Sequence, residues 1–193
     1  MKRILVTYAT TSGTTAEVAR KIAEELTLKG YQTMLLPLTE VTSLEGFDTI
    51  VLGAPMIVGW HRDAVKFLKT HQVVLAGKPL ALFATAMTLT QTGEKNVDGV
   101  PVFVDEKLAL PPQTAGKLTF KERYSAIPTY VRPMLTTADK ITPVSVALFG
   151  GRLDIYRLKW WAALFVMVII RVKPGEKRNW QAIKTWADSL VWL

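Results

Sequence analysis

Cysteine is absent from the 193 residues, and histidine occurs only twice, at His61 and His71. The missing thiols exclude a disulfide, a thiolate nucleophile, an iron–sulfur cluster and a cysteine-ligated zinc site. Two histidines cannot form a histidine-based metal centre by themselves, so we predict no metal site. The N-terminus contains only a three-residue aliphatic run, Ile4 to Val6, which is too short for the hydrophobic part of a secretory signal. We therefore expect a cytoplasmic protein.

The chain also lacks a hydrophobic run long enough to cross a membrane. Residues 160–170 are apolar throughout, but an eleven-residue helix spans about 16 Å against a hydrocarbon core of about 30 Å. Three interpretations remain: a helix in the core, a dimer interface, or shallow contact with the inner face of the membrane through residues 152–178. Aromatic residues and flanking basic residues favour the last: Tyr156, Trp160, Trp161, Arg152, Arg157, Lys159, Arg171, Lys173, Lys177 and Arg178.

The net charge of +8 is unevenly distributed. Residues 1–85 carry nine basic and seven acidic groups, residues 86–123 carry five of each, and residues 124–193 carry ten and four, a difference of +6. A basic excess favours nucleic acid, an anionic membrane or an acidic partner. We expect no nucleic acid, because Trp160 and Trp161 lie in an apolar run rather than in an open basic groove.

Apolar strands alternate with amphipathic helices along the chain. Val18, Ile22 and Leu26 recur at helical spacing between residues 14 and 29, and a second helix is expected at residues 61–73. The expected buried strands are residues 3–8, 31–38, 48–54, 78–85 and 142–150. This alternation indicates an α/β fold in which helices cover both faces of a parallel sheet. We expect one domain over residues 1–193.

Residues 86–123 interrupt the alternation. They are rich in Thr, Gly, Pro and Lys and lack helical periodicity, and residues 100–104 favour a short strand. A loop this long inside a compact domain is usually functional or mobile. We therefore predict an insertion after the fourth strand.

The segment between the first strand and the first helix contains five hydroxyls and one glycine but no lysine. It matches neither G-x-x-x-x-G-K-[ST] nor G-x-G-x-x-G, the loops of nucleoside triphosphate and dinucleotide sites. Amide groups at a helix N-terminus attract an anion, and a glycine lets the backbone approach it closely. The segment predicts a site for one monophosphate, and the alternative is a simple N-cap and turn. Its residues are Thr10, Thr11, Ser12, Gly13, Thr14 and Thr15.

The motif T-x-[ST]-G-x-T in this segment resembles the FMN phosphate loop of flavodoxins, with Thr10, Ser12, Gly13 and Thr15 at the matching positions. GAPMIVGWHRDAVKFL (53–68), LFGGRLD (148–154) and PGEKRNWQAIKTWADSL (174–190) are similar to the branch that includes menaquinone-dependent protoporphyrinogen dehydrogenases. The resemblance implies a flavodoxin-like, doubly wound five-stranded parallel sheet of order 2-1-3-4-5. It also implies FMN bound at the carboxyl ends of the strands.

Two further loops follow from the resemblance. Gly53 and Gly59 are expected to permit turns, Trp60 to stack on the flavin or to be partly buried, and His61 to be a proton donor, a ring neighbour or a helix cap. No catalytic side chain is assigned, because the cofactor carries the redox chemistry. The expected flavin contacts are Pro55, Met56, Ile57, Val58, Gly59, Trp60, Thr85, Ala86, Met87 and Thr88.

Three functions remain open from the sequence. The first is an FMN-dependent oxidoreductase of the protoporphyrinogen-dehydrogenase type, acting on a porphyrinogen-like substrate and passing electrons to a quinone. The second is a soluble flavodoxin-like electron carrier, although soluble carriers of this kind are typically acidic. The third is a non-catalytic FMN-binding module. A homo-oligomer is compatible with all three.

Overall fold

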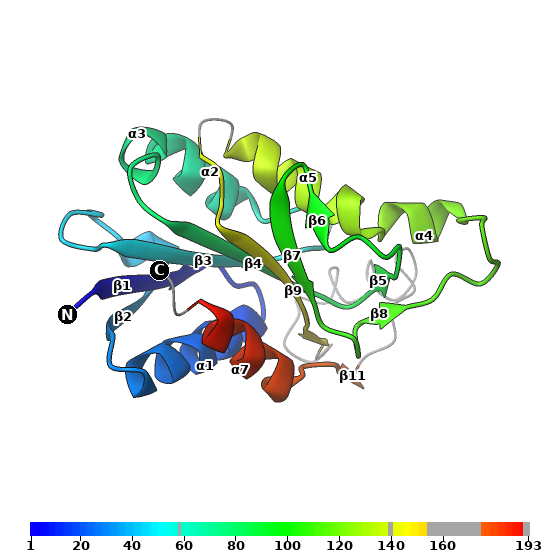
Figure 1. The fold of residues 1–193 in the computed structure, drawn as a ribbon, viewed down its shortest axis with the longest axis horizontal. Helices are drawn as coiled ribbons and strands as arrows, with labels where there is room; N and C mark the ends of the chain where they lie inside the picture. The colour runs from blue at the N-terminus through cyan, green and yellow to red at the C-terminus, as the bar shows by residue number, and fades with distance from the viewer. Residues whose placement is uncertain (58, 139–140, 154–174, 191–193) are drawn as a thin grey trace.

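The centre of the molecule is a seven-stranded sheet, seen in a computed structural model that describes residues 1–57, 59–138, 141–153 and 175–190 (Figure 1). Its order is β2-β1-β3-β4-β9-β7-β6, and every pairing is parallel except β6 with β7. The strands are β1 Arg3–Tyr8, β2 Gln32–Pro37, β3 Thr49–Pro55, β4 Leu80–Ala86, β6 Asn96–Val97, β7 Val100–Val104 and β9 Ser145–Gly150. The predicted order 2-1-3-4-5 is confirmed as β2-β1-β3-β4-β9, and the insertion adds two strands beyond it.

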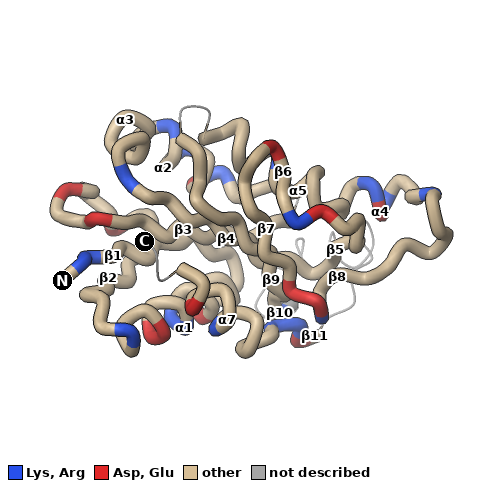
Figure 2. The backbone as a smooth tube through the Cα atoms, viewed as in Figure 1, with Lys and Arg blue, Asp and Glu red and all other residues tan. Residues whose placement is uncertain are grey.

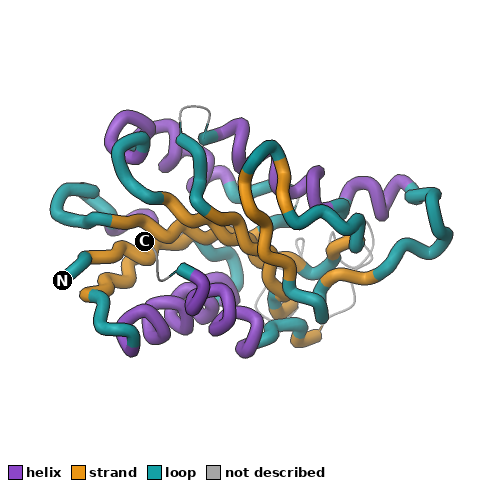
Figure 3. Tube along the Cα trace, viewed as in Figure 1, coloured by secondary structure: helices purple, strands orange, loops and turns teal. Residues whose placement is uncertain are grey.

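Helices cover both faces of this sheet, in three layers (Figure 3). One face packs against α1 Thr14–Leu28 and α7 Trp180–Ser189. The other packs against α2 Arg62–Thr70, α3 Gln72–Leu75 and α5 Ile127–Thr137. A short 3-10 helix, η1 Leu38–Glu40, follows β2.

The alternation of side chains along each strand produces the two cores. Ile4 and Val6 of β1 point to the α1/α7 face, whereas Leu5 between them points to the opposite face. On the α1/α7 face the Trp186 ring lies 5.6 Å from that of Phe149 and 6.1 Å from that of Phe83, measured between centroids. Its indole N–H donates to the Ser145 hydroxyl at 3.0 Å, so this buried aromatic cluster leaves no unpaired donor.

The insertion is an ordered lobe rather than a flexible loop. It contains β6 and β7 and three smaller elements, β5 Leu89–Thr90, β8 Ala109–Leu110 and α4 Phe120–Tyr124. Thr90 and Ser125 close its base, because the Thr90 N–H donates to the Ser125 carbonyl at 2.8 Å and their hydroxyls lie 2.9 Å apart. These bonds hold β5, at the start of the insertion, next to the end of α4.

A buried carboxylate joins the lobe to the rest of the fold. Asp105 follows β7 and is fully buried. Its two oxygens accept hydrogen bonds from the Asn179 side chain at 2.9 Å, the Lys107 N–H at 3.0 Å and the Gly150 N–H at 3.4 Å. Asp105 thus ties the ends of β7 and β9 to the start of α7.

Two local expectations differ from the structure. The helix predicted over residues 61–73 is divided at His71 into α2 and α3. Helix α5 was not predicted, because it contains Pro128 in its first turn and Pro133 in its interior, residues that normally argue against a continuing helix. The proline at the first turn is compatible with helix geometry, since the N–H groups there have no helical partner.

The chain after β9 forms a small ribbon. Residues Arg152–Leu153 (β10) pair antiparallel with Gly175–Glu176 (β11), and α7 follows. The apolar run 160–170, whose core, dimer and membrane interpretations were left open, lies outside the described residues. Within the described ranges, the helices are all too short or too polar to span a bilayer.

Candidate functional site

The turn between β1 and α1 leaves the start of α1 open. Gly13 is the N-cap residue and adopts φ 87°, in the left-handed region that favours glycine. Among the described residues no side chain caps this helix, and the first N–H groups of a helix have no partner within it. The Thr10 hydroxyl accepts a hydrogen bond from the Gly13 N–H at 3.0 Å, which fixes the turn. This geometry suits an anion at the start of α1.

Besides Thr10, two of the predicted hydroxyl groups bond within the protein. Thr14 donates to the Arg152 carbonyl at 3.0 Å. Thr15 is 1% exposed, and its hydroxyl lies 2.8 Å from that of Thr85 at the end of β4. Thr10 and Thr11 are exposed and Ser12 is half-buried, so these three hydroxyls are the accessible ones. Thr15 instead joins the first predicted cofactor loop to the third.

The second predicted loop follows β3 and turns tightly. The Met56 N–H donates to the Thr85 carbonyl at 2.9 Å, and the Ile57 N–H donates to the Gly59 carbonyl at 3.2 Å. Gly59 has φ 83°, so the expected turn there is confirmed. Pro55 and Met56 are buried, Ile57 is 46% exposed, and Val58 lies outside the described residues.

Gly53, by contrast, has a packing role. It lies inside β3, and a Cβ atom there would come within 1.8 Å of the Phe83 ring. The expectation that Gly53 permits a turn was therefore wrong. A glycine is required because the aromatic ring of the neighbouring strand occupies the space of a side chain.

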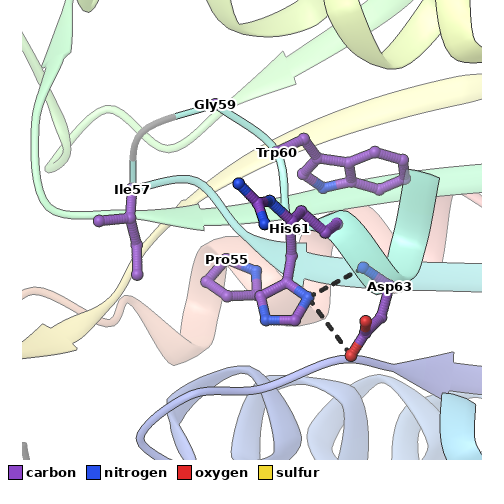
Figure 4. Close-up of a pocket in the computed structure, with 7 residues that line it drawn as sticks. Pro55, Ile57, Gly59, Trp60, His61 and Asp63 are labelled. Carbon is purple, nitrogen blue, oxygen red and sulfur yellow. Dashed lines mark hydrogen bonds and ion pairs between the residues drawn. The ribbon is translucent and has the colours of Figure 1, made fainter. Parts of the chain in front are cut away.

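A pocket of about 320 Å³ lies beside the second loop (Figure 4). Ile57, Trp60 and His61 contribute to its lining. Trp60 is only 6% exposed and packs in the core, and its indole N–H has no partner among the described residues. Stacking of Trp60 on a flavin stays a prediction. Among the described residues of this loop, Ile57 is an apolar side chain that is exposed.

His61 caps α2. Its Nδ1 accepts a hydrogen bond from the Asp63 N–H at 3.3 Å and lies 3.8 Å from the Asp63 carboxylate (Figure 4). Because Nδ1 acts as an acceptor, the proton of the neutral ring is on Nε2. The helix-cap interpretation of His61 is thus the one that the structure shows.

The third predicted loop begins within β4. Thr85 and Ala86 are the last residues of that strand, and Met87 and Thr88 follow it half-buried. The Thr88 hydroxyl lies 3.5 Å from the hydroxyl of Tyr130 on α5. Burial of the Tyr130 side chain raises the pKa of its phenol, so the phenol stays protonated.

A fourth segment completes the site and was not assigned from the sequence. The Gly151 N–H donates to the Ala86 carbonyl at 2.8 Å, next to the Thr14–Arg152 bond. A Cβ atom on Gly150 would lie 1.9 Å from the Lys177 carbonyl. The Gly-Gly pair at the end of a predicted strand was the available signal, since paired glycines mark close approach of backbones.

The four segments together fit a phosphorylated planar cofactor. The ends of β1, β3, β4 and β9 meet at one edge of the sheet, linked by the Thr15–Thr85, Met56–Thr85 and Gly151–Ala86 hydrogen bonds. The start of α1 offers uncapped N–H groups and accessible hydroxyls, whereas Ile57 adds an apolar surface nearby. In open α/β sheets, ligands bind outside the carboxyl ends of the strands. An anion at the start of α1 and a planar ring between the loops would occupy that position.

Comparison with known proteins agrees with this geometry. Residues 5–179 match the family model described as flavodoxin domain. Protoporphyrinogen IX dehydrogenase (quinone) from Escherichia coli strain K12 is 21% identical over 202 residues, covering 99% of this chain and 96% of that protein. A solved short-chain flavodoxin, associated with a non-canonical PDU bacterial microcompartment, is 15% identical with a TM-score of 0.52, covering 100% and 98% of the two chains.

A flavodoxin from Streptococcus pneumonia TIGR4 is 11% identical with a TM-score of 0.50 and covers 98% of both chains. At such identities the likeness to solved structures shows the fold alone. The family match extends over most of the chain and includes all four segments of the site. The chain therefore belongs to the flavodoxin domain family, and membership of that family indicates a flavin cofactor.

Proposed function

We propose that the protein is an FMN-dependent oxidoreductase of the protoporphyrinogen-dehydrogenase type, which oxidises a porphyrinogen-like substrate and passes electrons to a quinone. The observation that carries this proposal is the extent of the similarity to the Escherichia coli enzyme, 99% of this chain and 96% of that protein. The similarity thus includes the insertion and the chain after β9, which lie outside the five-stranded core.

The choice of FMN over a dinucleotide rests on the start of α1. One uncapped helix N-terminus with a left-handed Gly13 provides for one phosphate group. Under this proposal the accessible hydroxyls of Thr10, Thr11 and Ser12 donate to its oxygens, and the Thr15–Thr85 bond supports the neighbouring loop. The flavin, when bound, supplies the electron transfer. The protein binds and orients it and excludes water.

The substrate side is proposed to lie over the second loop. Ile57 of that loop is exposed, and it lines the adjoining pocket of about 320 Å³ together with Trp60 and His61. An apolar, exposed side chain suits a large hydrophobic substrate better than a small polar one. We assign no catalytic residue, because the flavin carries the redox chemistry of such a reaction.

A soluble electron carrier is the alternative, supported by the similarity of the whole fold to a short-chain flavodoxin. The net charge of this chain, +8, distinguishes it from an acidic carrier. The proposed location is cytoplasmic, with peripheral contact on the inner face of the membrane through residues 152–178. Most of that segment lies outside the described residues, so the contact is proposed from its sequence.

The test proceeds in two steps. The purified protein should show flavin absorbance, and chromatography of the released cofactor should identify FMN; FAD as the bound species would contradict the cofactor proposal. Anaerobic mixing with protoporphyrinogen and a menaquinone analogue should then produce protoporphyrin with reduction of the quinone. A protein that retains FMN but exchanges electrons only with protein partners would be a carrier, and one that exchanges none would be a binding module.

A further inference from the structure

Helix α4 is held firmly although it buries none of its side chains. Thr119 and Glu122 form a capping box, in which the Thr119 hydroxyl accepts from the Glu122 N–H at 3.3 Å and the Glu122 carboxylate accepts from the Thr119 N–H at 2.8 Å. The same carboxylate accepts from the Gln113 N–H at 2.6 Å. The capping box and the Gln113 bond therefore hold in place a helix none of whose side chains is buried.

The outward surface of α4 is aromatic. Phe120 is 86% exposed and Tyr124 is 42% exposed. At about 100° per residue, these two side chains lie about 40° apart around the helix, with Lys121 about 60° beyond Tyr124 and Arg123 about 60° before Phe120. Glu122 is placed on the opposite side, where it serves the cap.

The charge around this aromatic pair is positive. Lys117, Lys121 and Arg123 are exposed, and none of them forms an ion pair within the part of the chain that the structure describes. Figure 2 shows basic segments on α4 and in the loop that leads into it. The hydrogen bonds that Glu122 accepts, first from Gln113 and then from Thr119, lower its pKa and direct its charge toward the backbone.

We infer that this aromatic-basic face, formed by Lys117, Phe120, Lys121, Arg123 and Tyr124, is a docking surface for an anionic lipid bilayer. Phe120 and Tyr124 would enter the boundary between headgroups and acyl chains, and the three cations would meet anionic headgroups. The inference is independent of flavin binding and of the contact proposed through residues 152–178.

The size of the face favours lipid over a protein partner. Two aromatic side chains bury on the order of 150–250 Å² each, whereas a stable protein interface needs about 800 Å² on each side. A bilayer has no such minimum, because binding adds up from apolar area and charge at several points. Helix α4 also projects from the molecule at the far end of the insertion, where nothing in the described chain covers it (Figure 1).

Vesicle co-sedimentation tests the inference on the full chain. Anionic vesicles of equal parts phosphatidylcholine and phosphatidylglycerol are compared with vesicles of phosphatidylcholine alone. Each is measured at low and at high salt. The variant Phe120→Ser/Tyr124→Ser should lose on the order of tenfold or more in partitioning to the anionic vesicles. The matched control is Val73→Ser, because Val73 is 90% exposed on α3, at the opposite end of the molecule (Figure 1). This control should sediment like the wild type.

A second measurement uses the absence of cysteine from the chain. Phe120→Cys and Val73→Cys each introduce a single thiol for an environment-sensitive dye. The dye at position 120 should shift to shorter emission wavelengths with anionic vesicles, lose the shift at high salt, and show no shift at position 73. An unchanged spectrum at position 120 overturns the inference even if the serine variant fails to fold.

The outcomes separate the two lipid proposals. Suppose that Trp160→Ser/Trp161→Ser abolishes sedimentation and Phe120→Ser/Tyr124→Ser leaves it unchanged. That result would overturn the α4 surface and support the contact at residues 152–178 instead. Wild-type protein that stays in the supernatant at low salt would overturn both. Loss of sedimentation specific to the α4 variant, together with the dye shift, is the result that we expect.

Discussion

The backbone conformation of Gly13 is expected to be essential for the proposed phosphate site. Its φ of 87° lies in the left-handed region, and it is the N-cap of a helix that no side chain in the described part of the chain caps. The replacement Gly13→Val should lower FMN affinity at least about tenfold, because a branched side chain strains this backbone and crowds the approach of the phosphate. Fluorescence titration with FMN measures the change.

The matched control for Gly13 is Gly116→Val. Gly116 also has a positive φ, 75°, but lies in the insertion with open space around it. Both variants carry similar backbone strain, so only Gly13→Val should change flavin binding. Wild-type affinity in Gly13→Val would show that the turn has no part in a phosphate site.

Gly150 tests the fourth segment at the same scale. A Cβ atom at this position would lie 1.9 Å from the Lys177 carbonyl, and the contact is with backbone, which cannot rotate away. Gly150→Ala should therefore destabilise the fold by about 1–3 kcal/mol and separate the chain after β9 from the start of α7. Denaturant unfolding measures the loss, and Gly77→Ala, where the nearest atom is 3.8 Å away, serves as control. Equal stability of the two variants would contradict the close contact.

At the scale of elements, α1 and α7 are joined by a buried carboxylate. The Glu25 side chain is 4% exposed and pairs with Lys184 at 2.7 Å and Lys21 at 2.6 Å. Hydrogen bonds from Lys184 and then Lys21 lower the pKa of Glu25. A lowered folded-state pKa means that its stabilisation is present above the unfolded pKa and is lost as the pH falls through the folded value.

The variant Glu25→Gln should reduce the free energy of unfolding at pH 7 by about 1.5 kcal/mol, the low end for hydrogen bonds to a charged group. The low end applies because Lys184 is 43% exposed and water screens its charge. The difference from wild type should shrink as the pH falls through the lowered folded-state pKa of Glu25, because Glu25 itself then becomes protonated. Glu24→Gln removes an equal charge from an exposed position of the same helix and should change little. A difference that is constant with pH would exclude the ion pair as its cause.

The elements also show what the sequence can and cannot predict. The strands from β1 to β4 and helix α1 were predictable because their apolar residues follow a single period, as in Ile4–Val6 and in Val18, Ile22 and Leu26. Helix α5 was missed because Pro133 lies inside it, and tertiary burial of Tyr130 and Met134 outweighs that local penalty.

The same distinction applies within the candidate site. The hydroxyl-rich loop was found from local pattern, since a helix start depends on neighbouring residues, whereas the turn at Gly59 was implied by the resemblance to flavodoxins. The Thr15–Thr85 bond and the contact of Gly150 with Lys177 join residues far apart in the chain. No local pattern specifies such partners. Their assignment therefore required the folded structure.

We predict that residues 1–193 unfold as one cooperative unit. The insertion makes this prediction testable, because it is the part that could unfold separately. The lobe contributes β7 and β6 to the central sheet, and Val97, Val100 and Val102 are buried in the same core as β1, β3 and β4. Asp105 then links it to β9 and α7 through two hydrogen bonds, from the Gly150 N–H and from the Asn179 side chain. An insertion attached in this way cannot unfold while the sheet remains intact.

Calorimetry should accordingly show one transition whose calorimetric and van't Hoff enthalpies agree. The variant Asp105→Asn replaces an acceptor of three hydrogen bonds by an amide, which should lower the free energy of unfolding by about 1–3 kcal/mol. Because the lobe and the sheet share one core, the variant should lower the midpoint of a single transition rather than release an early one. As a control, Asp98→Asn alters another carboxylate of the lobe, which is 53% exposed and pairs with Arg132 of α5 at 3.5 Å. This variant should leave the midpoint nearly unchanged. A separate low-temperature transition in the wild type would mean that the insertion folds by itself, and the chain would then contain two cooperative units instead of one.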